Sequence, residues 1–463
     1  MAVMLQATFS RAKVAPARCK RSTTAAGAHK NCANDRRQMK NFGVLSRFSS
    51  IWLIALILAI GIFLRVWPST SFRLSGEGKS DHPAQADEEQ KKGVWVGRDE
   101  RAYCAYVALA RKDGILNFGD VVRAYLQSQA NRPDAIVPAT RIGFLVPATI
   151  IAEITGCDPL VALRCTSAIA SILLLLVSVV IGYRLGGTER MVLVTALMAV
   201  APLQIHLAQL SLVDGYFAFW AVLCAWFLWE TLQAPQQKGW LAAYVVSLFL
   251  LVLTKENAAF VFLALATVTI LFAVFRFGRV SVSLVAATIV APALAVLVLA
   301  ALVGGVGEWI SFYRTFTQKS AGLPYVVLFQ DGAWYRYLVD FTLLSPCIVV
   351  LALGSVFQLG EDSKTDVFWA IFLGASYIVM SIVPYGMSLR FAAFWDFPLR
   401  WLAVSQVIRL GYRFQKGRPL LLLSALSIAL IAIDLLQYWR YFVDGQIYDP
   451  VSFQLLRASH LIK

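Results

Sequence analysis

IASILLLLVSVVI (Ile169–Ile181) and LLLLSALSIALIAI (Leu420–Ile433) are two segments of the chain without a single charged residue. A helix needs about 20 mostly apolar residues to cross the hydrocarbon core of a bilayer, and both segments lie inside longer apolar runs. Of the 463 residues, 59% are hydrophobic and only 15% are charged, whereas roughly a quarter are charged in a soluble domain. A membrane β-barrel is disfavoured because its strands alternate apolar with polar residues. We therefore predict an all-α polytopic membrane protein.

The apolar runs predict about eleven transmembrane helices. They lie near residues 51–68, 161–183, 190–207, 214–232, 240–254, 258–276, 280–303, 335–358, 367–387, 391–409 and 419–437. Residues 142–154 are apolar but short, so we expect a re-entrant or interfacial helix there.

Basic residues in short loops predict the orientation of a membrane protein. If the N-terminus is cytoplasmic, four of the five inner connections are rich in Lys and Arg, and only 359–366 is acidic. The net charge of +15 is therefore assigned to loops that set orientation, and no nucleic-acid partner is expected. We predict a multi-pass protein of the plasma (bacterial inner) membrane with an extracytoplasmic C-terminus.

Four regions follow from this topology. Residues 1–50 are a basic cytoplasmic segment, of which 1–38 are expected to be untranslated or disordered. Residues 51–437 form the transmembrane domain, with a large first extracytoplasmic loop at 69–160, and 438–463 form a short extracytoplasmic tail. The seven cysteines form no CxxC motif or Cys/His cluster, so no metal site is predicted, although a requirement for a divalent cation stays open.

The sequence Asp99-Glu100-Arg101-Ala102-Tyr103 opens a segment with helical periodicity. Its apolar positions recur at i, i+3, i+4 and i+7: Tyr103, Tyr106, Val107 and Ala110. This spacing predicts an amphipathic helix in the outer membrane interface. Asp99 and Glu100 either cap this helix and complement its dipole or carry chemistry.

Further motifs follow in a fixed order. They are Pro138-x-x-Arg141, Ala162-Leu163-Arg164-Cys165-Thr166-Ser167-Ala168, Ser211-Leu212-Val213-Asp214, Leu253-Thr254-Lys255-Glu256, and Arg390-Phe391 with Pro398 behind it. Together with Asp-Glu-x-x-Tyr, this order resembles the membrane-embedded type-C glycosyltransferases. The nearest resemblance is to the family of protein O-mannosyltransferases and aminoarabinose lipid A transferases (glycosyltransferase family 39-like), over most of residues 50–410.

The resemblance implies an enzyme of hexosyltransferase type that moves a sugar from a polyprenyl-phosphate donor to an extracytoplasmic lipid, glycan or protein, with inversion. It implies Asp99 as the base and Glu100 as a supporting acid. A leaving phosphate needs cations in a site of low dielectric, and the resemblance assigns that role to Lys255 and Arg390. Tyr103 and Arg141 belong to the implied substrate-binding set. The resemblance also implies that membrane lipids surround the protein and that no cofactor is required besides the lipid-linked sugar donor.

Simpler explanations stay open for the two cations. Lys255 beside Glu256 is also the pattern of a local salt bridge, and Arg390 is also placed to extend its charge to the membrane surface. The chain departs from the aminoarabinose transferases where their Glu-Lys-Pro motif is expected, because the comparable stretch reads Asn131-Arg132-Pro133 or Val137-Pro138. The acceptor therefore stays open.

Two other functions are compatible with a polytopic chain. A secondary transporter or lipid flippase usually has repeated halves and charges near the midplane, but no repeat is evident and the charges gather at the outer face. A surface-polysaccharide polymerase or ligase usually has its largest outer loop late in the chain, whereas here that loop follows the first span.

Overall fold

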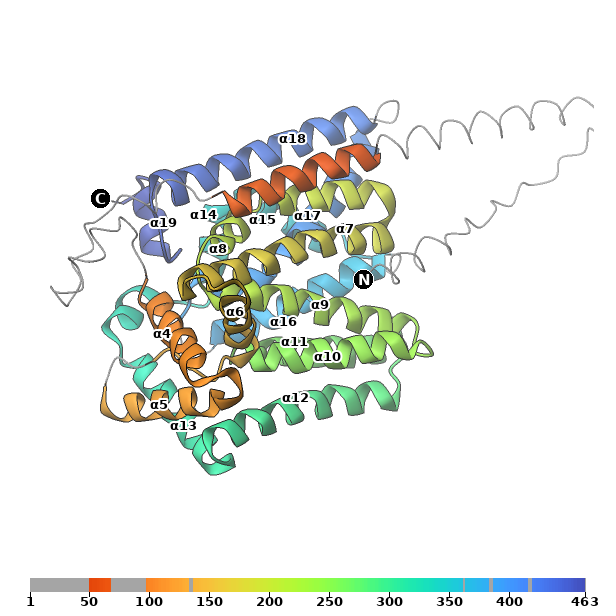
Figure 1. Ribbon diagram of the computed structural model, residues 1–463. Coiled ribbons are helices and arrows are strands. Elements are labelled where there is room, and N and C mark those ends of the chain that lie inside the picture. The colour runs from red at the N-terminus through yellow and green to blue at the C-terminus, as the bar shows by residue number, and fades with distance from the viewer. Residues whose placement is uncertain are drawn as a thin grey trace, which may run out of the picture. The chain divides into compact units, whose positions relative to one another are not determined.

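The computed structural model describes residues 50–67, 97–132, 136–360, 363–382, 386–414 and 419–462. Within these ranges the regular secondary structure is helical, without a strand (Figure 1). The residues from Leu53 onward form one compact unit. The predictions for residues 1–49 and for residues 69–96 of the first extracytoplasmic loop lie outside the described ranges.

Five helical segments are long and apolar enough to cross a membrane. They are α7 (Pro159–Ala199), α9 (Val213–Gln233), α12 (Val282–Val303), α16 (Lys364–Ile382) and Leu421–Asp444, which joins most of α18 (Pro419–Tyr438) to η6 (Trp439–Asp444). Shorter apolar helices accompany them: Ser50–Val66, α6 (Ile142–Thr155), α10 (Lys238–Thr254), α11 (Ala258–Val274) and α15 (Pro346–Val356). The chain is a multi-pass membrane protein, and the exact count of eleven spans stays a prediction.

Two predicted spans meet within α7. Gly187 breaks this helix with φ 75° and ψ −169°, a conformation open to glycine because it has no Cβ. A Cβ added at Gly182 would lie 2.7 Å from the Cα of Met191. The chain therefore folds back on itself after Gly182, as two successive spans require.

The predicted span 335–358 is wrong in its first third. Ser345 has φ −142° and ψ 67° and separates α14 (Arg336–Leu344) from α15. Pro346 begins α15, where its missing N–H costs no helical hydrogen bond. The nine residues of α14 carry Arg336 and Asp340 and are too few to cross a membrane by themselves.

The amphipathic helices gather at one end of the bundle. They include α4 (Arg98–Asp113), α5 (Phe118–Asn131), α13 (Val306–Ala321) and α19 (Ser452–Ala458), which lie at the same end of the long helices in Figure 1. The predicted face of α4 is present, since Tyr103, Val107 and Ala110 are its buried apolar residues. The short helix predicted at 142–154 is α6, with Pro147 inside it.

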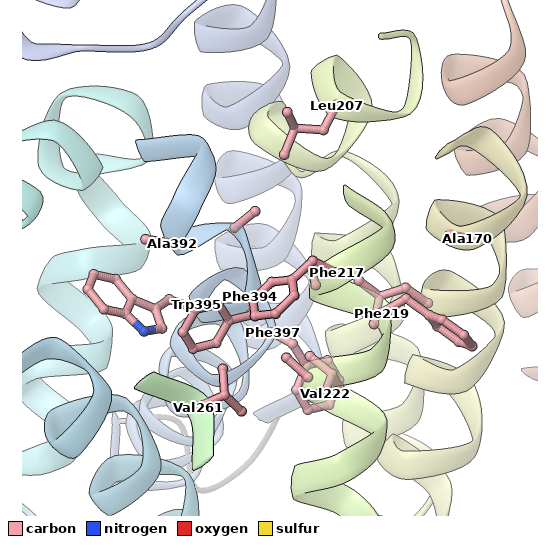
Figure 2. Packing of buried hydrophobic residues seen from close by; sticks show 14 of the residues in the cluster. Ala170, Leu207, Phe217, Phe219, Val222, Val261, Ala392, Phe394, Trp395 and Phe397 are labelled. Atoms are coloured by element: carbon pink, nitrogen blue, oxygen red, sulfur yellow. The ribbon is translucent and has the colours of Figure 1, made fainter. Parts of the chain in front are cut away.

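Aromatic side chains lock the segment that carries Arg390 to α9. The short helix η5 (Leu389–Trp395) is buried, and Figure 2 shows its Phe394 close to Phe217 of α9. The two rings meet edge to face with centroids 5.9 Å apart, a contact worth about 0.5–1.5 kcal/mol beyond the area it buries. This packing fixes Arg390, at one end of η5, relative to Asp214 in the first turn of α9.

Candidate active site

A cavity of about 970 Å³ opens among the helix ends and is lined by charged side chains from widely separated parts of the sequence. The charged lining residues are Arg98, Asp99, Arg141, Asp214, Lys255, Glu256, Arg390, Asp449 and Arg457. Four of the six predicted site residues therefore meet in one cavity. The other two, Glu100 and Tyr103, lie behind its wall.

Lys255 binds Asp214 across the deep part of the cavity. Its Nζ lies 2.5 Å from Oδ1 of Asp214, and only 3% of each residue is exposed. Lys255 follows the last residue of α10 in an extended conformation, with φ −161° and ψ 147°. Burial lowers the pKa of Lys255 below its ordinary value, and the nearby Asp214 carboxylate offsets part of that effect.

Glu256 faces a different partner. Neighbouring side chains of an extended backbone point in opposite directions. Lys255 and Glu256 therefore form ion pairs with different partners, Asp214 and Arg141. Arg141 donates from Nε to Oε2 of Glu256 over 3.1 Å and makes a second contact from Nη2 to Oε1. Burial alone would raise the pKa of Glu256, but the Arg141 guanidinium holds it below the usual range. The local Lys255–Glu256 bridge is thus replaced by two long-range pairs.

Tyr103 supports Arg141 from behind the cavity wall. Nη1 of Arg141 donates to the Tyr103 hydroxyl, and the guanidinium carbon lies 5.8 Å from the centre of the ring. Burial raises the pKa of Tyr103 well above its ordinary value, so the phenol is neutral. Its contacts fit a role in orienting Arg141.

Arg390 and Asp99 form the third ion pair. Nη2 of Arg390 lies 2.8 Å from Oδ2 of Asp99, whose side chain is 23% exposed. Arg390 itself is 8% exposed, so its charge is held inside the protein instead of extending to the membrane surface. Its Nε and Nη1 are buried without a hydrogen-bond acceptor among the described residues. Lys255 Nζ and the Arg390 guanidinium carbon lie 4.0 Å and 5.1 Å from the centroid of the same Phe391 ring, so both cations border that ring.

Glu100 occupies a structural position. The residue is fully buried; Oε2 accepts the N–H of Gly97 over 3.0 Å, and Oε1 accepts the N–H of Ser211 over 2.7 Å. A carboxylate three residues into a helix commonly caps it in this way. Both oxygens are therefore engaged by the backbone, and the contacts of Glu100 fit capping, whereas the neighbouring Asp99 lines the cavity.

The C-terminal tail contributes to the cavity, which the sequence did not predict. Residues between Gly445 and Ala458 line the cavity, and Asp449 lies 3.6 Å from Nε of Arg390. Nothing around Asp449 forms a recognisable motif, so no local signal marked it. Asp214 and Glu256 belong to two of the sequence motifs but have no predicted catalytic or binding role. The position of Asp214 at the start of an apolar run and that of Glu256 beside a lysine are signals in the sequence that mark them.

The described residues contain no cluster of three or more His, Cys, Asp or Glu side chains that could hold a metal ion. The carboxylates of the cavity are instead matched to cations. The site is therefore organised as a set of ion pairs around an open, partly apolar space, suited to a ligand that has both an anionic group and an apolar body.

Comparisons with known proteins find a family of similar sequence and structures of similar fold. Residues 147–316, which include Asp214, Lys255 and Glu256, match the family described as dolichyl-phosphate-mannose-protein mannosyltransferase. The crystal structure of the apo Archaeoglobus fulgidus oligosaccharyltransferase is similar in fold, with a TM-score of 0.51 and 14% identity; the match covers 84% of this chain and 55% of that one. This chain thus spans about half the length of that protein.

A second similar structure is that of ArnT from Cupriavidus metallidurans bound to undecaprenyl phosphate, with a TM-score of 0.48 and 12% identity over 88% of this chain and 77% of that one. The search of curated proteins gave no match. The family match extends over part of the chain, and the likeness to the solved structures shows the fold. The chain therefore has the polytopic fold of the type-C glycosyltransferases and resembles the protein O-mannosyltransferase family.

Proposed function

We propose that this protein transfers a sugar from a polyprenyl-phosphate donor to an acceptor at the extracytoplasmic face of the membrane. The observation that carries the proposal is Arg390, a buried guanidinium in the cavity whose Nη1 has no hydrogen-bond acceptor among the described residues and takes part in neither of its ion pairs. A buried donor without an acceptor is costly unless a ligand supplies one. A phosphate is an anion that a planar guanidinium binds through two parallel hydrogen bonds.

The donor phosphate would contact Arg390 and Lys255, which share the Phe391 ring. When the acceptor oxygen or nitrogen attacks the anomeric carbon, the bond from that carbon to the phosphate oxygen breaks and polyprenyl phosphate leaves. The two cations stabilise the charge that develops on the leaving oxygen. Attack from the face opposite the leaving group inverts the anomeric centre.

Asp99 is the proposed base. It lies in the cavity beside Arg390, and it is the most exposed of the carboxylates in the three ion pairs described above. A carboxylate within reach of the attacking hydroxyl or amine accepts its proton. A phosphate arriving at Arg390 competes with Asp99 for the guanidinium and thereby releases the carboxylate toward the acceptor. Arg141 and Glu256 would keep Lys255 aimed at the phosphate from the opposite wall.

The orientation of the chain belongs to the same proposal. Because basic residues favour the cytoplasmic side, the N-terminus would lie in the cytoplasm and the cavity on the extracytoplasmic side of a plasma (inner) membrane. The acceptor would then be a lipid, glycan or protein at that surface. Neither the family match nor the fold favours a transporter, a flippase or a polysaccharide polymerase or ligase.

The test uses purified protein in lipid nanodiscs and a panel of radiolabelled polyprenyl-phosphate sugars. Release of free polyprenyl phosphate is compared for the wild type, Asp99→Asn and Asp113→Asn. Asp113 is the last residue of the same helix and serves as the matched control for loss of a charge. We expect turnover by the wild type and Asp113→Asn, and donor binding without turnover by Asp99→Asn. Turnover that survives Asp99→Asn would return Asp99 to helix capping, and a wild type that neither binds nor cleaves any donor would refute the transferase.

A further inference from the structure

The tail of the chain brings a second carboxylate to the guanidinium that Asp99 uses. We propose that Asp449 is a positioning residue that shares Arg390 with Asp99. It thereby sets both the affinity of the site for the donor phosphate and the availability of the Asp99 carboxylate to the acceptor. This inference rests on the proposed function and assigns a role within the same site.

Asp449 is held rigidly at this place. It is 3% exposed, and its Oδ2 accepts hydrogen bonds from the Tyr325 hydroxyl and from Nε2 of Gln330, each over 2.9 Å. Its Oδ1 accepts a hydrogen bond from the Ser388 hydroxyl and faces Nε of Arg390 at 3.6 Å. Three donors from two segments therefore fix the carboxylate before any ligand arrives.

The segment around Asp449 contacts the neighbours of both Asp99 and Arg390. We call residues 446–450 the strap. The carbonyl of Pro450 accepts the N–H of Leu389, next to Arg390, over 3.4 Å. Tyr448 packs on Gly97, where an added Cβ would lie 2.1 Å from the phenol oxygen. The strap thus touches the start of α4, which carries Asp99, and the start of η5, which carries Arg390.

Further contacts hold the strap and its neighbours in place. The carbonyl of Tyr448 lies 2.9 Å from Nε2 of His206, which stacks on Phe442 with ring centroids 4.0 Å apart. Met387 donates its backbone N–H to the Gln330 carbonyl over 2.7 Å. The strap is therefore a fixed wall of the cavity, with its carboxylate aimed at Arg390.

Sharing one cation between two carboxylates has two opposite effects. Part of the attraction of Arg390 for the donor phosphate is cancelled by Asp449, which weakens donor binding. The same competition loosens the hold of Arg390 on Asp99, which leaves that carboxylate available to the acceptor. Neutralising Asp449 should therefore tighten donor binding and slow the chemical step together, whereas a merely structural residue would not strengthen binding when replaced.

The decisive variant is Asp449→Asn in the full chain, because asparagine keeps the shape of the side chain and one acceptor oxygen. We expect KM for the donor and the directly measured donor Kd to fall by about threefold or more, and kcat to fall by about tenfold, since hydrogen bonds to charged groups are worth about twice those to neutral groups.

For a second variant we predict a change in the donor Kd of the opposite sign. Ser388→Ala removes a donor from Oδ1 of Asp449 and leaves more of the carboxylate charge for Arg390. We expect the donor Kd to rise by about threefold in Ser388→Ala. General loosening of the strap would move both variants in the same direction, so a rise of Kd in both overturns the inference.

The outcomes separate this inference from the proposed function. Turnover by the wild type with an unchanged or raised Kd in Asp449→Asn leaves the transferase standing and refutes the shared cation. If the wild type binds no donor on the panel, both proposals fail. If Asp449→Asn does not fold, Ser388→Ala decides through two constants: the shared cation predicts a raised Kd for the donor without a loss of kcat, whereas a loosened strap raises Kd and lowers kcat, which refutes the inference.

Discussion

Replacing Gly143 with alanine would add a methyl group where α6 meets the end of α10. An added Cβ would lie 2.7 Å from the Thr254 hydroxyl oxygen and 3.0 Å from both the backbone carbon of Leu253 and the backbone nitrogen of Thr254. Rotating the threonine relieves the first contact only. The two backbone contacts require α6 and α10 to separate by a few tenths of an ångström. Lys255 and Glu256 follow at once, so both of their ion pairs must shift.

The matched control is Gly239→Ala. Gly143 and Gly239 are each the second residue of their helix, so the helix-propensity gain of alanine is the same for both. No atom lies within 4 Å of a Cβ added at Gly239. The difference between the two variants is therefore the steric cost alone, about 1–3 kcal/mol for an extra methyl group in a packed interface. In a chain of 463 residues a cost of this size lowers the melting temperature by about 1–3 °C.

The activity should also fall. A displacement of about 1 Å in a catalytic group costs on the order of 100-fold in rate, so a shift of a few tenths of an ångström at Lys255 should cost roughly three- to tenfold. The assay is thermal unfolding in detergent together with release of polyprenyl phosphate in nanodiscs, for both variants at one temperature below unfolding. Equal melting temperatures and equal rates in Gly143→Ala and Gly239→Ala would refute the close packing of α6 on α10 as the support of the site.

Two further variants test the structural carboxylates. Glu100→Gln leaves only one acceptor oxygen for the N–H groups of Gly97 and Ser211, so we expect a loss of about 1–3 kcal/mol in stability, with turnover retained below the melting temperature; a folded but inactive variant would instead give Glu100 a chemical role. Burial raises the pKa of Asp340 to about 7, and the Ser452 hydroxyl and the Arg336 guanidinium offset only part of that effect. The unfolded carboxyl ionises near pH 4, so wild-type stability should fall as the pH rises from about 4 to about 7. Asp340→Asn should accordingly melt higher than wild type at pH 8 and nearly equally at pH 4, and a constant difference across this range would contradict the raised pKa.

The elements that follow a simple period could be predicted from sequence. The buried face of α4 follows from the spacing of Tyr103, Val107 and Ala110, because a helix brings residues three and four apart to one side. The boundary between α14 and α15 was missed because the apolar run continues across it. Ser345 and Pro346 marked the break, and Arg336 and Asp340 marked α14 as too polar to cross a membrane.

The candidate site was predictable in part. Asp99, Lys255 and Arg390 share the cavity, as expected from a predicted topology that puts all three on the same side of the membrane. The ion pairs between the site residues could not be predicted from hydropathy and loop charge. Arg141 and Glu256 are joined across 115 positions, and the place of Asp449 depends on the turn that follows η6. Such pairs depend on how helices pack, and neither hydropathy nor local spacing records that.

The extended residue between α10 and α11 has a consequence for how this protein can vary. Connections between helices are usually where insertions and deletions are tolerated best. At this junction one residue more or fewer would exchange the directions of Lys255 and Glu256. The lysine would then face Arg141 and the glutamate would face Asp214, so that two attractions become two repulsions inside a buried cavity. Length at this short junction is therefore as constrained as residue identity, and homologous chains with an active cavity should show no gap there.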